Sequence, residues 1–330
     1  MDIGGGATEH PTKPKAVEEE DDDDNYDEEG VILVEVVEGS KHGDGSIFRP
    51  DKHPLHKFYH LHDTRETRLE PMRLSDPTDI CHPCWTACKQ HIGCDMVQIF
   101  SLKLSKLPAR AAAGPIQVYG FMAVRDAVDP LRNYLFNRSR DDPFLIQDVR
   151  SDPFIYLSGP KRGIYLQGEV LVEYDMRIKR GNDRIQDDDL LLVDGAATIT
   201  DLMHNHRALT IRITGDCGAR VDIARTLLKQ SVEATVHVWV TNLGRHEHAR
   251  GLHLSITGLL GRLHQEIKIF RGTIEDLCDA KRFVVAVRLK SVLFLCFKGP
   301  ALVAHGCIYR CHELDDSLTV HVKVTWSNLY

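Results

Sequence analysis

The chain has 330 residues, of which 42% are apolar and 27% charged, with nine cysteines and a formal net charge of −7. This apolar fraction supports a sizeable core, and the length fits one large β domain with a tail. The start of the chain lacks the basic and apolar segments of a signal peptide, and charged residues interrupt the longest apolar stretch. We therefore expect an intracellular, cytoplasmic protein without a transmembrane helix, whose cysteines are reduced.

The negative charge is concentrated in residues 1–30, which carry 12 acidic and 2 basic side chains. The remaining 39 basic and 36 acidic residues form a nearly neutral body, so the sequence has no strong nucleic-acid signature. Dense like charge with little apolar surface predicts that residues 1–30 are disordered. Such a tail either keeps the protein soluble or acts as a regulatory arm that competes for a basic surface.

Residues 31–95 are expected to form an irregular linker that contains cysteine and histidine. Its first apolar run, Val31–Val37, could add a strand or serve as a docking peptide. Further along, four thiols fall within fourteen residues, and the first two have the spacing of a zinc knuckle. The later spacings match no second knuckle, so free cysteines are favoured over zinc and no cofactor is predicted. The candidate metal ligands are Cys81, Cys84, Cys88 and Cys94.

From residue 96 onward, apolar and polar residues alternate with a period of two, which predicts strands. Ile116–Val124 is apolar on both faces and predicts a central strand. In a later strand, Val172 is expected to face the core and Glu173 the solvent. The same alternation marks residues 232–240 and 318–326, and the latter should tie the C-terminal region into a sheet.

The many strands and short turns predict a mainly β fold for residues 96–330, an antiparallel sandwich or a barrel-like fold with a few short helices. Val221–Gln230 and Ile274–Ala280 are the candidate helices.

The segment from Arg125 to Asp142 concentrates charge between two apolar stretches. In a structural interpretation, its arginines lock a loop through bidentate bonds to aspartates of the same segment. In a functional interpretation, the segment binds a ligand or partner. The aspartates are Asp126, Asp129, Asp141 and Asp142, and the candidate binding residues are Arg132, Asn133, Arg138 and Arg140.

The block from VYGFMAVRD to NRSRDDPF resembles the signature of the domain of unknown function 6598, a grass family. This domain also follows the toxin domain of the jasmonate-induced ribosome-inactivating protein. The resemblance implies a β-rich fold and a plant protein connected with stress or defence, and it supplies no catalytic residues. The toxin's Glu-Ala-x-x-Arg motif is not reproduced, because Glu233 and Ala234 are followed by His237 where arginine is expected. A stand-alone rRNA N-glycosidase is therefore disfavoured.

Two classes of function stay open. The favoured one is a non-catalytic interaction or regulatory module with an unidentified protein partner and no membrane partner. The alternative is an enzyme of unrecognised type, with a polar site in the Arg125 to Asp142 block. A deep pocket with convergent Arg, Asp and His groups would favour the enzyme, whereas a filled core and a shallow surface would favour the module.

Overall fold

A computed structural model describes most of the chain from residue 31 onward. The described residues are 31–34, 36–49, 55–70, 91–111, 114–181, 188–200, 207–242, 252–261, 263, 265–274, 281–299, 302–307, 312–315 and 318–329. The acidic residues 1–30 and three of the four candidate zinc ligands, Cys81, Cys84 and Cys88, lie outside this part.

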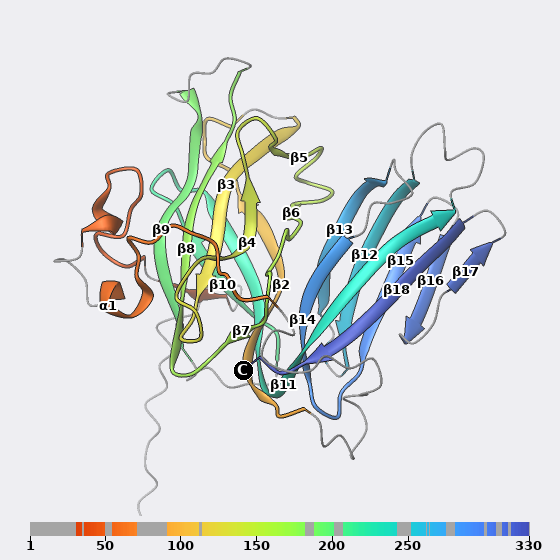
Figure 1. Cartoon of the computed structure of the whole chain (residues 1–330). Coiled ribbons are helices and arrows are strands. Elements are labelled where there is room, and N and C mark those ends of the chain that lie inside the picture. Colours follow the sequence, from red (N-terminus) through yellow and green to blue (C-terminus); the bar gives the residue numbers. More distant parts are fainter. Residues whose placement is uncertain are drawn as a thin grey trace, which may run out of the picture.

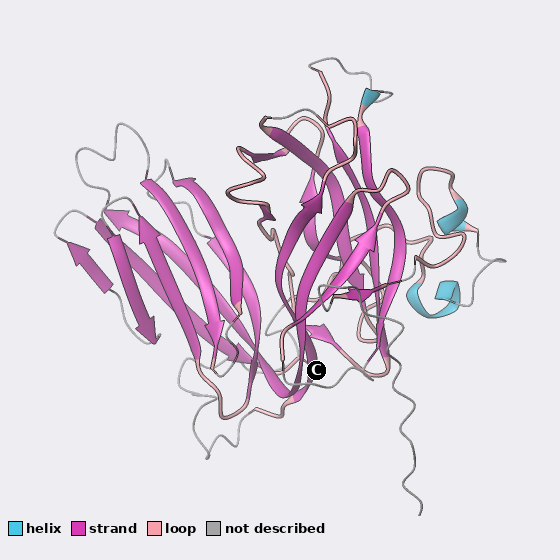
Figure 2. Cartoon of the chain, turned by 180° about the vertical axis from the view of Figure 1, so that it is seen from behind, coloured by secondary structure: helices cyan, strands magenta, loops and turns pink. Residues whose placement is uncertain are grey.

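The described elements are almost all strands, as Figure 2 shows. In chain order they are β1 (Ile32–Leu33), the 3₁₀-helix η2 (Ser46–Phe48), α1 (Leu55–Tyr59), β2 (Cys94–Lys106), β3 (Ile116–Arg125), β4 (Asn133–Arg138), β5 (Phe144–Ile146), β6 (Phe154–Ile155), β7 (Ile164–Tyr165), β8 (Glu169–Ile178), β9 (Leu190–Thr200), β10 (Leu209–Thr214), β11 (Arg220–Asn242), β12 (Leu252–Leu260), β13 (Glu266–Ile274), β14 (Lys281–Arg288), β15 (Leu293–Gly299), β16 (Leu302–Cys307), β17 (His312–Asp315) and β18 (Leu318–Ser327).

The strands form three sheets that pack as two sandwiches. A long sheet has the order β1-β10-β11-β18-β17, with β2, β6, β7 and β14 attached. One part of it faces the five-stranded sheet β4-β3-β8-β9 with β5, and another part faces the four-stranded sheet β13-β12-β15-β16. Each pair of sheets encloses its own hydrophobic core. The mainly β, largely antiparallel fold expected from the sequence is confirmed, and none of the described sheets closes into a barrel.

Strand β11 belongs to both sandwiches (Figure 1). Its first half pairs with β2 and β10, and its second half pairs with β14 and β18. The helix expected over Val221–Gln230 is wrong, because these residues lie within this strand. Ile223 packs in the first core and Leu228 in the second, so burial on both faces hides the period of two. Of the other candidate helix, Ile274–Ala280, only the first residue is described, at the end of β13.

Residues 36–49 and 55–70 form an N-terminal layer against the five-stranded sheet, and the helical turns of this layer lie beside β8 and β9 (Figure 1). Ile47, Tyr59 and Leu61 form a small third core with Leu171 and Ala196. Because this layer covers the face expected to meet solvent, Glu173 is fully buried. The expectation that Val172 faces the core is confirmed, whereas a solvent-facing Glu173 is wrong.

In the part of the chain that the structure describes, no helix has the length and apolar character needed to cross a membrane.

Candidate functional site

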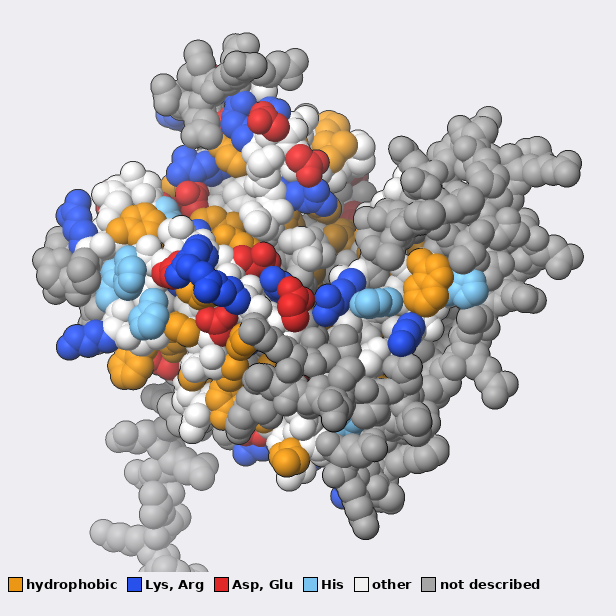
Figure 3. All heavy atoms as spheres, viewed as in Figure 1, with side chains coloured by type: hydrophobic (Ala, Val, Ile, Leu, Met, Phe, Trp, Pro, Cys, Tyr) orange, Lys and Arg blue, Asp and Glu red, His pale blue; other side chains and the backbone are white. Residues whose placement is uncertain are grey.

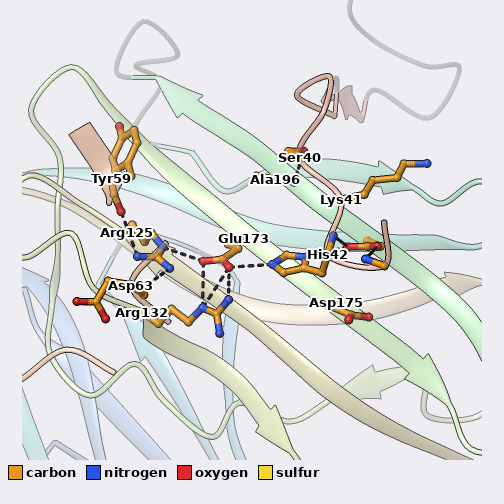
Figure 4. Close-up of polar contacts among 12 residues, drawn as sticks. Ser40, Lys41, His42, Tyr59, Asp63, Arg125, Arg132, Glu173, Asp175 and Ala196 are labelled. Carbon is orange, nitrogen blue, oxygen red and sulfur yellow. Dashed lines mark hydrogen bonds and ion pairs between the residues drawn. The ribbon is translucent and has the colours of Figure 1, made fainter. Parts of the chain in front are cut away.

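A buried ion cluster lies between the five-stranded sheet and the N-terminal layer (Figure 4). Its hub is the Glu173 carboxylate on β8. The Arg125 Nε atom donates to Glu173 Oε2 at 2.7 Å, and Arg132 Nε lies 3.1 Å from both carboxylate oxygens. Burial alone would raise the pKa of Glu173, but hydrogen bonds from His42 and Arg132 and the charge of Arg125 outweigh it and lower this pKa to about 2.

The cluster attaches the N-terminal layer to the first sandwich. The Arg125 guanidinium donates to the backbone carbonyl groups of Tyr59 and Asp63, at 3.0 and 2.8 Å. The backbone of Arg132 pairs with residues 65–67, because its N–H donates to Arg65 O and its carbonyl accepts from Thr67 N. The backbone around residues 59–67 is thus held by the Arg125 guanidinium and by one short bridge to the backbone of Arg132.

A second buried ion pair shapes the loop from Ser158 to Gly163. Arg162 forms a bidentate pair with Asp126, at 2.7 and 2.8 Å, and both side chains are almost fully buried. The next residue, Gly163, donates its N–H to Glu233 on β11 at 2.6 Å. At Gly159 a Cβ atom would lie 2.1 Å from Tyr134 O, so only glycine allows this approach. The loop is therefore fixed to both β4 and β11.

These two anchored segments form one wall of a cleft between the sandwiches. It holds two neighbouring cavities of about 470 and 220 Å³, which share part of their lining. Charged side chains gather over this junction in Figure 3. The first sandwich contributes Glu66, Glu70, Tyr134, Asn137, Arg138, Leu157, Ser158, Gly159, Pro160 and Lys161, the second contributes Ile267, Ile269, Phe270, Arg282, Phe283, Val284 and Val285, and Gln98 comes from β2.

Glu70 joins the two walls of the cleft electrostatically. Its Oε1 atom lies 2.8 Å from Lys161 Nζ on the first wall, and its Oε2 atom lies 3.4 Å from Arg282 Nη1 on the second. All three side chains are partly exposed to solvent. The Glu70 carboxylate therefore lies in the cleft between two cations, Lys161 from the first sandwich and Arg282 from the second.

The four binding candidates from the sequence have different positions. Arg132 is buried against Glu173, and Asn133 is buried and bonded to the backbone of Arg162 and Lys161. Arg140 is paired with Asp189 at 2.7 Å. Arg138 alone among the four lines a cavity, and it pairs with the exposed Asp142 at 2.6 Å.

The loop-locking partners also differ from the expected ones. Of the three arginines, only Arg138 pairs with an aspartate of its own block. Arg132 and Arg140 bind acidic residues on β8 and next to β9, which approach through sheet pairing rather than through the sequence. Asp126 is indeed an anchor, but its partner is Arg162 from the later loop.

Of the candidate zinc ligands, only Cys94 is described. It lies at the start of β2, and burial raises the pKa of its thiol to about 12, which disfavours the metal-binding thiolate. Among the described residues, no group of three or more His, Cys, Asp or Glu side chains could hold a metal ion.

Sequence patterns do not single out the ionic residues that line the cleft. Lys161 lies in the Ser-Gly-Pro-Lys-Arg-Gly turn, which is a visible signal for a rigid loop. Glu70 and Arg282 carry no local signal, because they are 212 residues apart and meet only through the packing of the two sandwiches.

The fold and site define a mainly β protein whose polar cleft lies between two sandwiches that share a strand. Residues 96–304 match the family described as "Domain of unknown function (DUF6598)", and the chain belongs to this family. No curated protein matches the chain significantly.

Solved structures give weak similarities only. The calcium-bound two-domain structure of Extended-Synaptotagmin 2 matches 72% of this chain and 98% of that chain, at 11% identity and a TM-score of 0.24. The longer structure of the same protein, which includes its SMP domain, matches 72% of this chain and 58% of that chain, at 11% identity and a TM-score of 0.24. Human GIVD cytosolic phospholipase A2 matches 71% of this chain and 32% of that chain, at 9% identity and a TM-score of 0.23. At these TM-scores, the similarities establish neither a shared fold nor a shared function.

Proposed function

We propose that the cleft binds an acidic segment of a partner protein and that the chain acts as a non-catalytic interaction module. The observation that carries this proposal is the Glu70 carboxylate, which bridges Lys161 and Arg282 across the cleft. A carboxylate of a partner has the same chemistry and can take the same place. Because the bridge is exposed to solvent, its own contribution to stability is small and displacement costs little.

The rest of the lining suits a peptide. Phe283 and Pro160 offer apolar surface, while Ser158 and Asn137 offer groups that can bond to a peptide backbone. Arg138 adds a third cation at the neighbouring cavity. An extended peptide with acidic side chains can therefore run along both cavities, with its apolar groups on the apolar lining and its carboxylates near the cations.

The alternative function, an enzyme with a polar site in the Arg125 to Asp142 block, receives less support from the same geometry. Arg125, Arg132 and Glu173 converge, but they are buried and bonded to one another. None of these three residues lines either of the two cavities. The Arg125 to Asp142 block thus supplies a rigid wall, and its exposed contribution to the cleft is Tyr134, Asn137 and Arg138.

The proposal extends to the setting that the sequence resemblance implies, a response of plants to stress or defence. Capture of partners from stressed and unstressed leaf extract tests this part. A partner whose binding segment is acidic, enriched under stress, supports it.

Direct binding tests the cleft itself. We expect a fluorescently labelled octaglutamate peptide to bind the full chain, with an affinity that falls as salt is added. The double variant Lys161→Ala/Arg282→Ala should bind at least about tenfold more weakly, because two charge-assisted contacts are lost. The matched control is Lys103→Ala/Arg288→Ala, which removes two exposed cations that do not line the cleft. Equal affinities of the two double variants would refute the proposal.

A further inference from the structure

The segment from residue 36 to 49, here called the strap, covers the free edge of the five-stranded sheet. Strand β9 is the last strand of that sheet. The strap bonds to it, because Val37 N donates to Ala196 O at 2.8 Å and Ala196 N donates to Ser40 Oγ at 2.9 Å. Further along the strap, the N–H groups of His42 and Gly43 donate to the Asp194 carboxylate at 2.8 and 2.9 Å.

The His42 side chain is the charged contact that fastens the strap (Figure 4). Its Nδ1 lies 2.8 Å from Asp194 Oδ1, and its Nε2 lies 2.8 Å from Glu173 Oε1. Ionised carboxylates only accept hydrogen bonds, so both ring nitrogens must carry a proton to satisfy both contacts. The imidazole is 8% exposed and packs edge-on against Phe121, which leaves water little access to replace a lost bond. The geometry therefore requires an imidazolium ion.

Glu173 pairs with two guanidinium groups besides His42, those of Arg125 and Arg132. The other carboxylate at the ring, Asp194, pairs with the imidazole itself. The charged groups that face this site from the surrounding elements are Lys41 and Asp44 on the strap, Arg125 on β3, Arg132 before β4, Glu173, Asp175 and Arg177 on β8, and Asp194 on β9.

Glu173 connects the strap to the wall of the cleft. Its carboxylate bonds His42 at one side and both arginines at the other. Through its backbone, Arg132 holds residues 65–67, the same stretch that contributes Glu66 to the cleft and leads to Glu70. A change at His42 therefore reaches the cleft through one shared carboxylate and one backbone bridge.

We propose that His42 is a proton-dependent clasp that regulates the cleft: its imidazolium holds the strap on the sheet and steadies the segment of the cleft wall that carries Glu66 and Glu70, and loss of the proton loosens both. This inference rests on the proposed function, since it assigns a control to the same cleft. When the proton is lost, one of the two carboxylates faces a nitrogen lone pair in a buried site.

The direction of the pH effect follows from the shift of His42. Burial alone would lower its pKa, but the hydrogen bonds and charges of Asp194 and Glu173 outweigh burial and raise this pKa above 6.5. A group with a raised pKa stabilises the folded arrangement fully below its unfolded pKa and loses this effect as pH rises through the folded pKa. The clasp is thus closed near pH 6 and opens at higher pH.

Strap protection can be measured separately from binding. Hydrogen exchange of the His42 and Gly43 amides is followed from pH 6.5 to 9 and corrected for the intrinsic exchange rate at each pH. Above the raised pKa of His42, we expect the strap-opening constant to rise, by up to about tenfold per pH unit. Binding of labelled octaglutamate is measured over the same range. Burial lowers the pKa of His237, which lies opposite Arg282.

Two variants complete the experiment. His42→Gln should make strap exchange and peptide affinity independent of pH, whereas His62→Gln, which alters an exposed histidine, should behave as the parent. Asp194→Asn keeps one of the two acceptor oxygens that the His42 and Gly43 amides use and removes the negative charge, so it should move the opening to lower pH. The proposal holds if exchange and affinity change together in the parent and not in His42→Gln.

The outcomes separate the two proposals. A pH-dependent strap with constant peptide affinity would refute the regulation and leave the proposed function intact. Equal exchange profiles of the parent and His42→Gln would refute the clasp itself. Absence of peptide binding at every pH would refute the proposed function, even if the strap responds to pH as expected.

Discussion

The buried cluster around Glu173 and the cleft around Glu70 use the same chemistry and have opposite roles. In each, one glutamate bridges two cationic side chains. Glu173 is fully buried and joins groups of one sandwich to its N-terminal layer, whereas Glu70 is 46% exposed and joins two sandwiches. Burial decides between them: a buried bridge is costly to break, and an exposed bridge exchanges readily with outside anions.

The comparison also separates the arginines of one charged block. Arg132 has entered the buried cluster, and Arg138 stays at the surface near a cavity, although only six residues separate them. The difference arises because the N-terminal layer covers one end of the block and leaves the other end open.

Removing the buried carboxylate should have the largest effect. Glu173→Ala leaves the guanidinium groups of Arg125 and Arg132 without their shared counter-charge, and we expect it to lower the free energy of unfolding by about 3–5 kcal/mol. Urea denaturation measures this loss. Glu169→Ala on the same strand is the control and should cost less than about 1 kcal/mol. Similar losses for the two variants would show that the cluster does not hold the first sandwich.

Acid should weaken the buried cluster. Because the pKa of Glu173 falls from 4.5 to about 2, its ionised form stabilises the fold above pH 4.5, and this contribution disappears as pH falls toward 2. The loss is of the order of 3 kcal/mol. Denaturation at pH 5, 4, 3 and 2 checks it, with Glu173→Gln as the variant that should lack this component. An equal pH slope for both proteins would contradict the assignment.

The arginine series should follow burial. Arg132→Ala strands a buried carboxylate and should cost a few kcal/mol, whereas Arg138→Ala breaks an exposed pair and should change stability by less than about 0.5 kcal/mol. Thermal denaturation of the two variants measures the difference. Equal losses would mean that exposure does not separate structural from binding arginines in this block.

The cleft cations should matter little for stability. Lys161→Ala/Arg282→Ala removes partly exposed partners, so the expected change in unfolding free energy is below about 1 kcal/mol. Denaturation under the conditions of the binding assay measures it, and a loss near that of Glu173→Ala would show that these cations are structural.

Local patterns in the sequence predict the strands well. Val172 and Glu173 alternate as a strand requires, and Ile116–Val124 is a central strand because both of its faces are apolar. The pattern gives the two faces of a strand but not what lies on each. Glu173 is buried because the N-terminal layer covers it, and the sequence near Glu173 does not predict that layer.

The double-sandwich arrangement and the cleft depend on contacts distant in sequence. Val221–Gln230 resembles a helix because apolar residues serve two different cores from one strand. The Glu70 to Arg282 contact forms only once the second sandwich is placed against the first. The Ser-Gly-Pro sequence before Lys161 signals a turn, but a pattern of residue types does not show which distant residues pair with Lys161.

The most direct test of the central claim is the affinity of Glu70→Gln for an acidic peptide. If Glu70 occupies the place of a ligand carboxylate, removing its charge frees Lys161 and Arg282 and should tighten octaglutamate binding several-fold, with stability unchanged within about 0.5 kcal/mol. Fluorescence anisotropy at low salt measures this affinity, with Glu169→Gln as a control for the change in net charge. Affinity that is equal to the control, or weaker than the parent, would contradict the account.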